Sequence, residues 1–468
     1  MKYSIKLREY QIEAIDKIAS SNGKLLVNAC AGAGKTYIPL YLRKRYPALK
    51  KVLVVCPASV KDQWRSVINS IFPEDTAFIA KGAYKTEYAE KILEVDFVII
   101  NYDILFSRTG AKSWTSVLTR ADFKLLVVDE SHKVGNKDSN RSKCLYDIGC
   151  KVPYRILLTA TPLTSNLSGL WGQLHIIDPL QFVTQSKFMN YFAPPEPQTI
   201  FIKNGNGKKL RIWKPGKIQH LDELQDIIQK YCYVIGSDEV YKHLAGVQRT
   251  EIPCVIEDKA VLDAVNEIKN QSISSSLDMR KAKDMLTASR QLLGKAKVSI
   301  AVSWLKDYLE GTTEKIVVFA YHRAVVEDVA DKLGKVAVKF YGGMSEKEKE
   351  SNKSAFINNP DVRVIVMNID TCTGVDGLNT VSRTCFYVEN TGLPGLFDQS
   401  EGRVRRANST FDAYFTYILK ADVLDGAILD VMWERKKLFD SIMTGKETEV
   451  NMEDEAVDVI RKLKGEDK

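Results

Sequence analysis

The stretch LLVNACAGAGKT, residues 25–36, predicts a buried strand, then a loop of small residues, then the start of a helix. In a loop of Ala and Gly no side chain blocks the backbone N–H groups, so they can close around phosphates. Lys35 would reach the outer phosphates, and the Thr36 hydroxyl would bind Mg²⁺ at a helix N-terminus whose dipole favours anions. Ala29 stands where the usual pattern has its first Gly, so the alternative is an ordinary glycine-rich turn. The loop residues that would line the phosphates are Ala31, Gly32, Ala33 and Gly34.

The length and composition indicate a multidomain globular protein. With 468 residues the chain is too long for one ordinary core, so we expect at least two domains. Its 45% apolar and 27% charged residues are typical of a soluble protein. The net charge of +8 fits a polyanionic partner without proving one. Eight cysteines occur without any C-x-x-C pattern, which favours reduced thiols over disulfides or zinc.

The beginning of the chain, MKYSIKLREYQ, is polar, and no apolar run approaches the ~20 residues that cross a bilayer. We therefore expect no membrane contact and a cytoplasmic location, in a bacterium or a phage-infected host, or a nuclear one if the source is eukaryotic.

Short apolar runs alternate with amphipathic segments along the first part of the chain. Because such strands have no polar face, they predict a parallel sheet covered by helices on both sides, an α/β fold. Ligands of these sheets bind at the carboxyl ends of the strands, where the polar candidates fall. The runs are LLVN (25–28), VLVVC (52–56), FVII (97–100), LLVVD (125–129) and ILLT (156–159).

The same alternation returns later and predicts a second parallel sheet without a phosphate loop. Its apolar runs are KIVVFA (315–320), VAVKFY (336–341), VRVIVM (362–367) and TCFYVE (384–389), and the series ends at 414–419. Two similar halves with one loop suggest that the nucleotide lies at their interface. The predicted domains are a first α/β domain (1–185), a helical and β-hairpin insertion (186–300), a second α/β domain (301–445) and a charged tail (446–468), which we expect to be a frayed helix or disordered.

Two carboxylates, Asp129 and Glu130, occur at the end of the apolar run LLVVD (125–129). Charged side chains at the end of a buried strand suggest a functional role. In a nucleotide site Asp129 would hold Mg²⁺, and Glu130 would orient and deprotonate the attacking water. The alternative is a helix N-cap followed by a turn. The loop at 25–36 upstream favours the nucleotide site.

A cluster of arginines occurs in QSEGRVRR, residues 399–406. A charged helical face is ordinarily exposed to solvent. Arginines of a second domain that close on a γ-phosphate, however, stabilise the transition state. ATP would then join the two halves and hydrolysis would release them, which is the physical basis of a motor.

The order of these blocks resembles superfamily 2 helicases and translocases, and within them the Swi/Snf-type group. Two RecA-like domains with ATP at their interface are what the resemblance implies for the fold. The absence of acidic residues in the loop block, and a compact insertion, make the chain more similar to fork-remodelling or phage-type recombination (branch-migration) helicases than to nucleosome remodellers. The matching blocks are LREYQ (7–11), AxxGxGKT (29–36), VVCPASVKDQW (54–64), VIINYDIL (98–105), DESH (129–132), LTATPLTSN (158–166), IDPLQF (177–182), FAYHRAVVEDVADKL (319–333), TGVDGLN (373–379) and QSEGRVRR (399–406).

The resemblance also implies roles for individual residues. Arg8, Gln11 and Gly377 would contact the nucleotide, with Gln11 on the adenine. Catalysis would rest on Lys35, Asp129, Glu130, Gln399, Arg403 and Arg406, while Arg405 stands where this group often has His. His132, Thr159 and Thr161 would couple hydrolysis to movement. The residues expected to contact nucleic acid are Pro57, Ser59, Asn101, Tyr102, His322 and Thr371.

The segment TIFIKNGNGKKLRIWKPGK, residues 199–217, predicts a β-hairpin, because two alternating runs flank Asn-Gly-Asn-Gly. Basic and aromatic side chains on such a ribbon could hold phosphates and stack a base at a strand junction. A solvated hairpin with the tryptophan packed underneath is the alternative. The side chains concerned are Lys203, Lys208, Lys209, Arg211 and Trp213.

We therefore expect an ATP- and Mg²⁺-dependent DNA helicase or translocase that acts on duplexes, forks or junctions, with replication or recombination proteins as possible partners. Three alternatives stay open: an RNA helicase, a duplex translocase that is the motor of a remodelling or restriction complex, and a nucleic-acid clamp without enzymatic activity. The side chains expected at the ATP site argue against the clamp.

Overall fold

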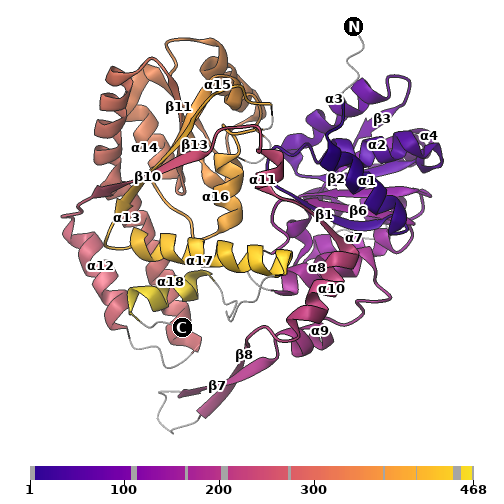
Figure 1. Cartoon of the computed structure of the whole chain (residues 1–468), viewed down its shortest axis with the longest axis horizontal. Helices are drawn as coiled ribbons and strands as arrows, with labels where there is room; N and C mark the ends of the chain where they lie inside the picture. Colours follow the sequence, from indigo (N-terminus) through magenta and orange to yellow (C-terminus); the bar gives the residue numbers. More distant parts are fainter. Residues whose placement is uncertain are drawn as a thin grey trace. The chain divides into compact units, whose positions relative to one another are not determined.

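The computed structural model describes residues 6–106, 113–163, 167–201, 209–271, 276–372, 375–406, 408–445 and 455–465, with the backbone alone for 197–201, 209–215 and 276–277. The chain forms two compact units (Figure 1). Unit 1 comprises Met1–Pro194, Lys217–Val240 and Ser441–Met452, and unit 2 comprises Pro195–Gly216, Tyr241–Asp440 and Glu453–Lys468.

Unit 1 is built on a seven-stranded, wholly parallel sheet, as predicted. Its inner strands are buried along almost their whole length, which explains their uninterrupted apolar sequences. Strands and helices alternate along the chain, so polar loops collect at the carboxyl ends of the parallel strands. In spatial order the strands are β3 (Ala77–Ile79), β4 (Phe97–Asn101), β2 (Val52–Cys56), β5 (Leu125–Asp129), β6 (Tyr154–Thr159), β1 (Lys24–Ala29) and β9 (Cys232–Ile235).

Two helices of unit 1 follow β1 and β2. These are α2 (Tyr37–Arg45) and α3 (Lys61–Ile71). The others are α1 (Glu9–Ser20), α4 (Tyr88–Glu94), α5 (Tyr102–Leu105), α6 (Trp114–Leu118), α7 (Asn140–Gly149), α8 (Leu167–Ile177), α9 (Gln185–Phe192), α10 (Leu221–Tyr231) and α11 (Ser237–Val240).

Unit 2 contains a second wholly parallel sheet, of six strands. In spatial order the strands are β10 (Val247–Cys254), β15 (Tyr414–Ala421), β14 (Ser382–Tyr387), β11 (Lys315–Ala320), β13 (Val364–Asn368) and β12 (Ala337–Phe340). The two sheets confirm the predicted α/β class with two RecA-like parts.

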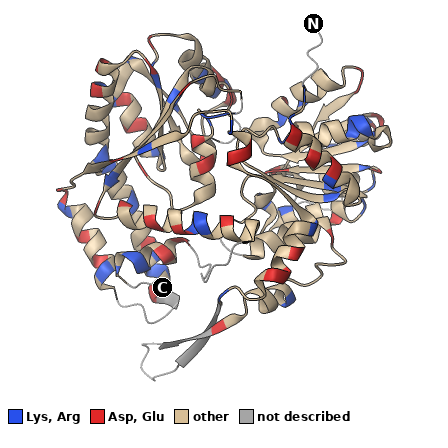
Figure 2. Cartoon of the chain, in the orientation of Figure 1, with Lys and Arg blue, Asp and Glu red and all other residues tan. Residues whose placement is uncertain are grey.

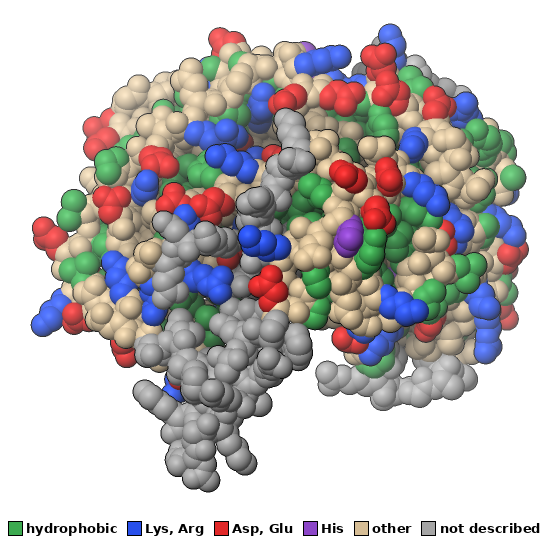
Figure 3. All heavy atoms as spheres, turned by 60° about the horizontal axis from the view of Figure 1, so that its bottom comes forward, with side chains coloured by type: hydrophobic (Ala, Val, Ile, Leu, Met, Phe, Trp, Pro, Cys, Tyr) green, Lys and Arg blue, Asp and Glu red, His purple; other side chains and the backbone are tan. Residues whose placement is uncertain are grey.

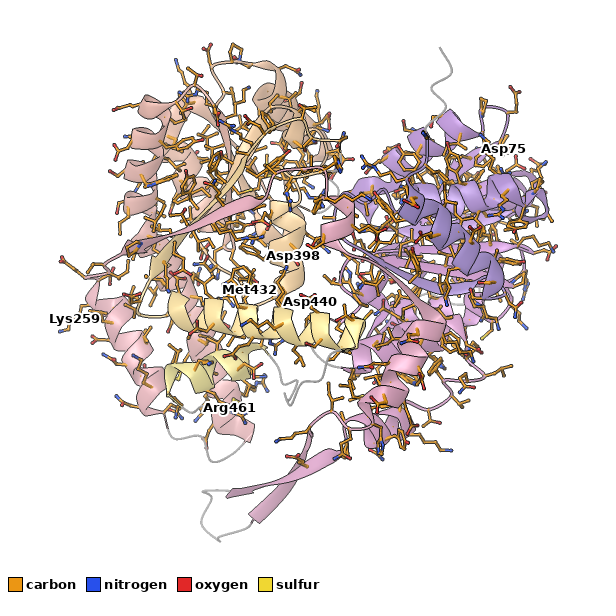
Figure 4. The ribbon with its side chains drawn as sticks, viewed as in Figure 1. Asp75, Lys259, Asp398, Met432, Asp440 and Arg461 are labelled. Atoms are coloured by element: carbon orange, nitrogen blue, oxygen red, sulfur yellow. The ribbon has the colours of Figure 1, made fainter. Side chains whose placement is uncertain are left out.

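Helices cover both faces of the second sheet and bury an apolar cluster on each. One cluster includes Phe356 of α15 (Glu346–Asn358), Phe397 of α16 (Pro394–Glu401) and Met432 of α17 (Asp425–Thr444). The other lies under α13 (Ser276–Gly311) and α14 (Arg323–Leu333). Figure 4 labels Met432, whose side chain is fully buried.

The C-terminal helix differs from the sequence prediction. The stretch 455–463 was expected to be a frayed helix or disordered, and this expectation is wrong, because α18 (Glu455–Leu463) packs into a third apolar cluster. Val459 and Ile460 enter this cluster beside α12 (Lys259–Asn270) and α13. Asp458 forms a buried ion pair with Arg435 of α17 at 2.8 Å. The remainder of the tail lies outside the described residues.

The apolar runs of the sequence did not predict three of the strands, β3, β9 and β10. β3 has three residues, and β9 and β10 each lie at an edge of a sheet. An edge strand is partly exposed, so VQRTEIPC in β10 alternates in polarity and lacks an apolar run. The stretch 186–300, expected as an insertion, therefore adds one strand to each sheet.

The predicted hairpin is present. β7 (Pro195–Phe201) and β8 (Lys209–Pro215) pair antiparallel, from Pro195 opposite Pro215 to Phe201 opposite Lys209. The connecting residues 202–208 lie outside the described part of the chain. Among the described strands, β7 and β8 pair only with each other. In the same described ranges, every helix is too short or too polar to cross a membrane.

A buried ion pair joins α13 to the first residue of α17. Lys297 and Asp425 are 1% and 3% exposed, and Lys297 Nζ lies 2.7 Å from Asp425 Oδ2. Nζ also donates to the Leu419 carbonyl at 2.9 Å, and Asp425 Oδ2 accepts from Ala421 N at 2.8 Å. Both charges are therefore fully compensated by neighbours.

Lys297→Met should destabilise unit 2 by about 3–5 kcal/mol, because it leaves the Asp425 carboxylate buried without its cation. Urea unfolding at constant pH measures the loss. The double variant Lys297→Met/Asp425→Asn should recover much of it, since no charge stays buried. A cost below about 1 kcal/mol, the size expected for the exposed Lys339–Asp331 pair, would contradict this account.

Candidate functional site

The loop after β1 has the backbone geometry of a phosphate-binding loop. Gly32 and Gly34 both have positive φ, at 75° and 73°, a backbone conformation that residues other than glycine rarely adopt. A Cβ on Gly34 would lie 2.6 Å from Gln11 Nε2. Lys35 Nζ donates to the carbonyl of Ala29 at 3.0 Å, so the ammonium folds back over the loop. Thr36 is half-buried and is the N-cap residue of α2.

Gln11 on α1 is attached to this loop. Its Nε2 donates to the carbonyls of Ala33 at 3.0 Å and Gly34 at 3.2 Å, while its Oε1 accepts from Arg8 N at 2.9 Å. The amide is 5% exposed. Gln11 therefore ties the start of α1 to the loop. Its contact with adenine stays a prediction.

The carboxylate of Asp129 is fixed at the end of β5. Its Oδ2 accepts from Trp64 Nε1 at 2.9 Å, and its Oδ1 accepts from Glu130 N at 3.0 Å. Its backbone carbonyl accepts from the Tyr102 hydroxyl. Glu130 has φ 53°, an uncommon conformation for a residue with a side chain. Two hydrogen bonds thus fix the carboxylate of Asp129, and a third fixes its backbone.

Burial, together with the neighbouring charge of Glu130, raises the pKa of Asp129 to about 6. The bonds from Trp64 and Glu130 N, and the positive charge of Lys35, act in the opposite direction. Burial also raises the pKa of Tyr102, and the charge of Asp129 contributes. A divalent cation would stabilise the ionised forms of two carboxylates in such a poorly solvated place.

His132 joins Glu130 to the end of β6. His132 Nδ1 lies 3.4 Å from Glu130 Oε2, 3.1 Å from Thr159 Oγ1 and 3.5 Å from Thr161 Oγ1. Thr161 N donates to Thr159 Oγ1 at 3.0 Å. The three predicted coupling residues therefore form one network with the predicted catalytic carboxylate.

Sequence reasoning missed the role of Trp64. It lies in a quoted block, but an apolar side chain on an amphipathic helix is ordinarily a core residue, and only its indole N–H shows otherwise. Trp64 is 1% exposed. No local pattern indicates that this N–H meets Asp129, because the two residues are 65 positions apart.

Two of the residues expected to contact nucleic acid are internal. Asn101 and Tyr102 are 6% and 3% exposed. Asn101 Oδ1 accepts from Lys61 Nζ at 2.9 Å, and Tyr102 binds the Asp129 carbonyl. In this arrangement both side chains support the site from inside. Of the others in unit 1, Pro57 is buried and Ser59 is exposed.

The arginines of unit 2 face the loop around Val375 and Asp376. Arg403 Nη1 and Arg406 Nη2 both donate to the Val375 carbonyl at 3.1 Å, and Arg406 forms an ion pair with Asp376. Burial lowers the pKa of Arg406, and the charge of Arg403 adds to this effect. Gln399 is buried at 4% exposure on the preceding helix. These predicted catalytic residues thus lie together.

The other predicted residues of unit 2 are at the carboxyl ends of β11 and β13. His322 Nδ1 lies 2.6 Å from Glu389 Oε1, whose other oxygen accepts from the backbone N–H of His322 at 2.8 Å. Thr371 Oγ1 donates to the Asn368 carbonyl at 3.2 Å. Gly377 has φ 92°.

Lys203 and Lys208 lie outside the described residues, and for Lys209, Arg211 and Trp213 only the backbone is described. Their role stays a prediction.

Asp129→Asn should become more stable relative to the wild type as pH rises. The carboxyl pKa is raised from 3.8 to about 6 in the folded state. Below pH 4 it is protonated in both states and costs nothing, while between pH 4 and 6 ionisation progressively destabilises the fold. Unfolding in EDTA should show a relative gain of about 1–3 kcal/mol between pH 4 and 7. The exposed Asp62→Asn should show no such trend, and a flat or opposite trend in Asp129→Asn would contradict the assignment.

Comparison with known proteins identifies a family and a fold. Residues 10–292 match the SNF2-related domain. The human DNA annealing helicase and endonuclease ZRANB3 is 21% identical over 456 residues, which cover 96% of this chain and 41% of that protein. The Caenorhabditis elegans homolog of SWI/SNF-related matrix-associated actin-dependent regulator of chromatin subfamily A-like protein 1 is 23% identical over 92% of this chain and 60% of its own length. The chain thus spans about half the length of these relatives.

A solved structure with a similar fold is that of the DUF1998 helicase MrfA bound to DNA and AMPPNP, with a TM-score of 0.55 and 14% identity over 94% of this chain and 51% of that one. The sequence match covers more than half of the chain and includes the phosphate loop, the carboxylates and the coupling network. This chain therefore belongs to the SNF2-related domain family.

Proposed function

We propose that this protein is an ATP-dependent DNA motor, a helicase or translocase acting on duplex or branched DNA. One observation carries the proposal. The phosphate-type loop at 32–36 is close enough for the charge of Lys35 to lower the Asp129 pKa, and Glu130 beside it is joined through His132 to Thr159. The loop that would bind phosphates therefore lies near Asp129 and Glu130. Glu130 in turn contacts His132, which contacts Thr159 at the end of β6.

In this proposal the side chains of unit 1 bind and activate ATP. The N–H groups of the loop and Lys35 hold the phosphates, because a small-residue loop and a helix N-terminus attract anions. Glu130 orients the attacking water and takes its proton. His132 lies against Glu130, so a change at the carboxylate moves its hydrogen bonds to Thr159 and Thr161.

Thr36 and Asp129 are the residues that would hold Mg²⁺. The fit rests on chemistry: Asp129 is a hard oxygen donor in a poorly solvated place, with its carboxylate already oriented by Trp64. A bound divalent cation supplies charge that screens the phosphates from one another. The protein's own contribution is to keep this carboxylate ionised and oriented at neutral pH.

Unit 2 would contribute Gln399, Arg403 and Arg406. Two guanidinium groups of one turn share the Val375 carbonyl, so they are oriented together. Positive charge placed near a γ-phosphate stabilises the charge that develops in the transition state. Because unit 2 would respond to the nucleotide through these groups, hydrolysis would alter its affinity for unit 1.

DNA as the substrate is supported by the relatives and by charge. The human relative is named as a DNA annealing helicase, and the solved structure with a similar fold is bound to DNA. The chain carries a net charge of +8. On the face drawn in Figure 3, Lys and Arg are interspersed with Asp and Glu, without a broad basic surface among the described side chains. From the relatives and the net positive charge, we propose contacts with backbone phosphates, which make binding steeply dependent on salt.

Lys35→Ala and Glu130→Gln should each remove most ATP turnover while the fold stays intact. Loss of a general base lowers the rate by about 10²–10⁴-fold. Steady-state phosphate release with saturating DNA measures the effect, and circular dichroism checks the fold. Asp122→Asn, which removes an exposed carboxylate of the same unit, should turn over like the wild type. Near-normal turnover of either site variant would refute the assignment.

The kind of nucleic acid that stimulates hydrolysis distinguishes the candidate motors. Single strands, plain duplexes, forks, four-way junctions and RNA should be compared while strand displacement is followed in the same samples. Strongest stimulation by forks or junctions, with displacement, is the expected result. Stimulation by plain duplex without displacement would indicate a translocase, and preference for RNA would indicate an RNA helicase.

We propose further that the hairpin β7–β8 acts at DNA branch points. It pairs with no other described strand, and its connecting segment carries Lys203 and Lys208. Deletion of 203–214 should spare DNA-stimulated ATP turnover and abolish separation of branched duplexes. A fork-unwinding assay measures the effect, and replacement of 203–208 by neutral residues tests the charge alone. Unchanged unwinding after deletion would refute this role.

A further inference from the structure

The turn that follows α16 presents charged side chains to two different partners. The backbone stays helical through this turn, since Gly402 N donates to the Asp398 carbonyl at 2.9 Å and Arg405 N donates to the Glu401 carbonyl at 3.3 Å. Residues four apart therefore share a face. Arg403 and Arg406 face the loop at Val375, as described above.

Arg405 faces the opposite way. Its Nη2 donates to the carbonyl of Ala245 at 3.0 Å, and its Cζ lies 4.5 Å from the ring centroid of Tyr241. A guanidinium stacked on an aromatic ring with one hydrogen bond to the backbone is held in orientation as well as position. Arg405 thus contacts residues 160 positions earlier in the chain.

Glu401, one turn before Arg405, contacts the same segment. Arg249 of β10 donates from Nε to Glu401 Oε1 at 2.9 Å and from Nη2 to Oε2 at 2.7 Å, a bidentate ion pair. Thr416 Oγ1 of β15 donates to the same carboxylate at 2.8 Å. The Glu401 side chain is 9% exposed, so the pair is shielded from water on its acidic side.

The segment held by these two residues is one of the places where the chain passes from unit 1 into unit 2. Val240 is the last residue of this stretch in unit 1, and Tyr241 is the first in unit 2. The segment 241–249 is therefore covalently continuous with the strand β9 of the first sheet and hydrogen-bonded to the turn of the arginines. A displacement of this segment pulls directly on that turn.

The helix before this turn is also tied to another part of unit 2. Lys436 of α17 forms an ion pair with Asp398 of α16, and Figure 2 shows charged residues of both signs along α17. That pair is partly exposed and lies one turn before Glu401. Glu401 and Arg405, by contrast, contact the segment 241–249.

We propose that Glu401 and Arg405 are positioning residues that couple the segment 241–249 to Arg403 and Arg406. They contact no reacting atom. They fix the backbone from which the two arginines extend, so movement of the connecting segment sets where the guanidinium groups lie during ATP hydrolysis. This inference rests on the proposed role of Arg403 and Arg406 in that reaction.

Arg405→Gln and Glu401→Gln test the proposal by steady-state ATP turnover with saturating DNA. Each should lower kcat about ten-fold, since each removes charged hydrogen bonds that orient the turn. The KM for ATP should change less than about two-fold, because loss of transition-state orientation alone leaves ground-state binding unchanged. All rates are measured well below the melting temperature of each variant, so unfolding does not contribute.

Two further variants sharpen the test. Arg405→Lys keeps the charge and a donor but loses the planar group, and it should recover part of kcat. The double variant Glu401→Gln/Arg405→Gln should lose less than the product of the single losses, since both act on one turn. The matched control is Arg383→Gln, which breaks a bidentate pair with Glu314 elsewhere in unit 2 and should keep the wild-type kcat.

A kcat within two-fold of the wild type in both single variants would overturn the proposal. So would a raised KM with unchanged kcat, or a lower melting temperature as the sole effect. Failure of the proposed function has a different signature: Lys35→Ala would then turn over ATP normally, whatever the variants of the turn do.

Discussion

The site depends on one constraint, a carboxylate held in a poorly solvated place at the end of a buried strand. Asp129 is fixed by the indole of Trp64 and by the backbone N–H of Glu130, while burial raises its pKa to about 6. Such a group is costly for the fold on its own. It becomes favourable when positive charge lies beside it, which Lys35 supplies in part. A buried charged group that lowers the stability of the fold is characteristic of functional sites.

The parallel sheet gives this carboxylate its neighbours. β5 lies between β2 and β6, and β1 lies beside β6, so the loops after these strands emerge at one edge. The phosphate-type loop follows β1, Trp64 follows β2, and Thr159 ends β6. Because the strands run in the same direction, the phosphate-type loop, the two carboxylates and the network of His132 and Thr159 all lie at the same edge of the sheet. His132 adds a side-chain contact from the carboxylates to Thr159 at the end of β6.

Unit 2 uses the same architecture differently. Its sequence has no second phosphate-loop pattern, and the polar residues of functional interest gather on the turn after α16. Arg403 and Arg406 share one carbonyl, while Glu401 and Arg405 hold the segment 241–249. Opposite faces of a single helical turn thus serve two purposes, which follows from the spacing of three and four residues.

The sequence by itself determined both parallel sheets and the phosphate-type loop, because buried parallel strands are apolar throughout and the loop is local. It also marked Asp129 and Arg403 through motif order. The tertiary structure decided that Trp64 binds Asp129, that Tyr102 is internal, and that Arg405 holds Ala245. These contacts join residues 65, 27 and 160 positions apart, and no local pattern specifies such a partner. The packing of α18 was likewise decided by a buried pair and an apolar cluster supplied by distant segments.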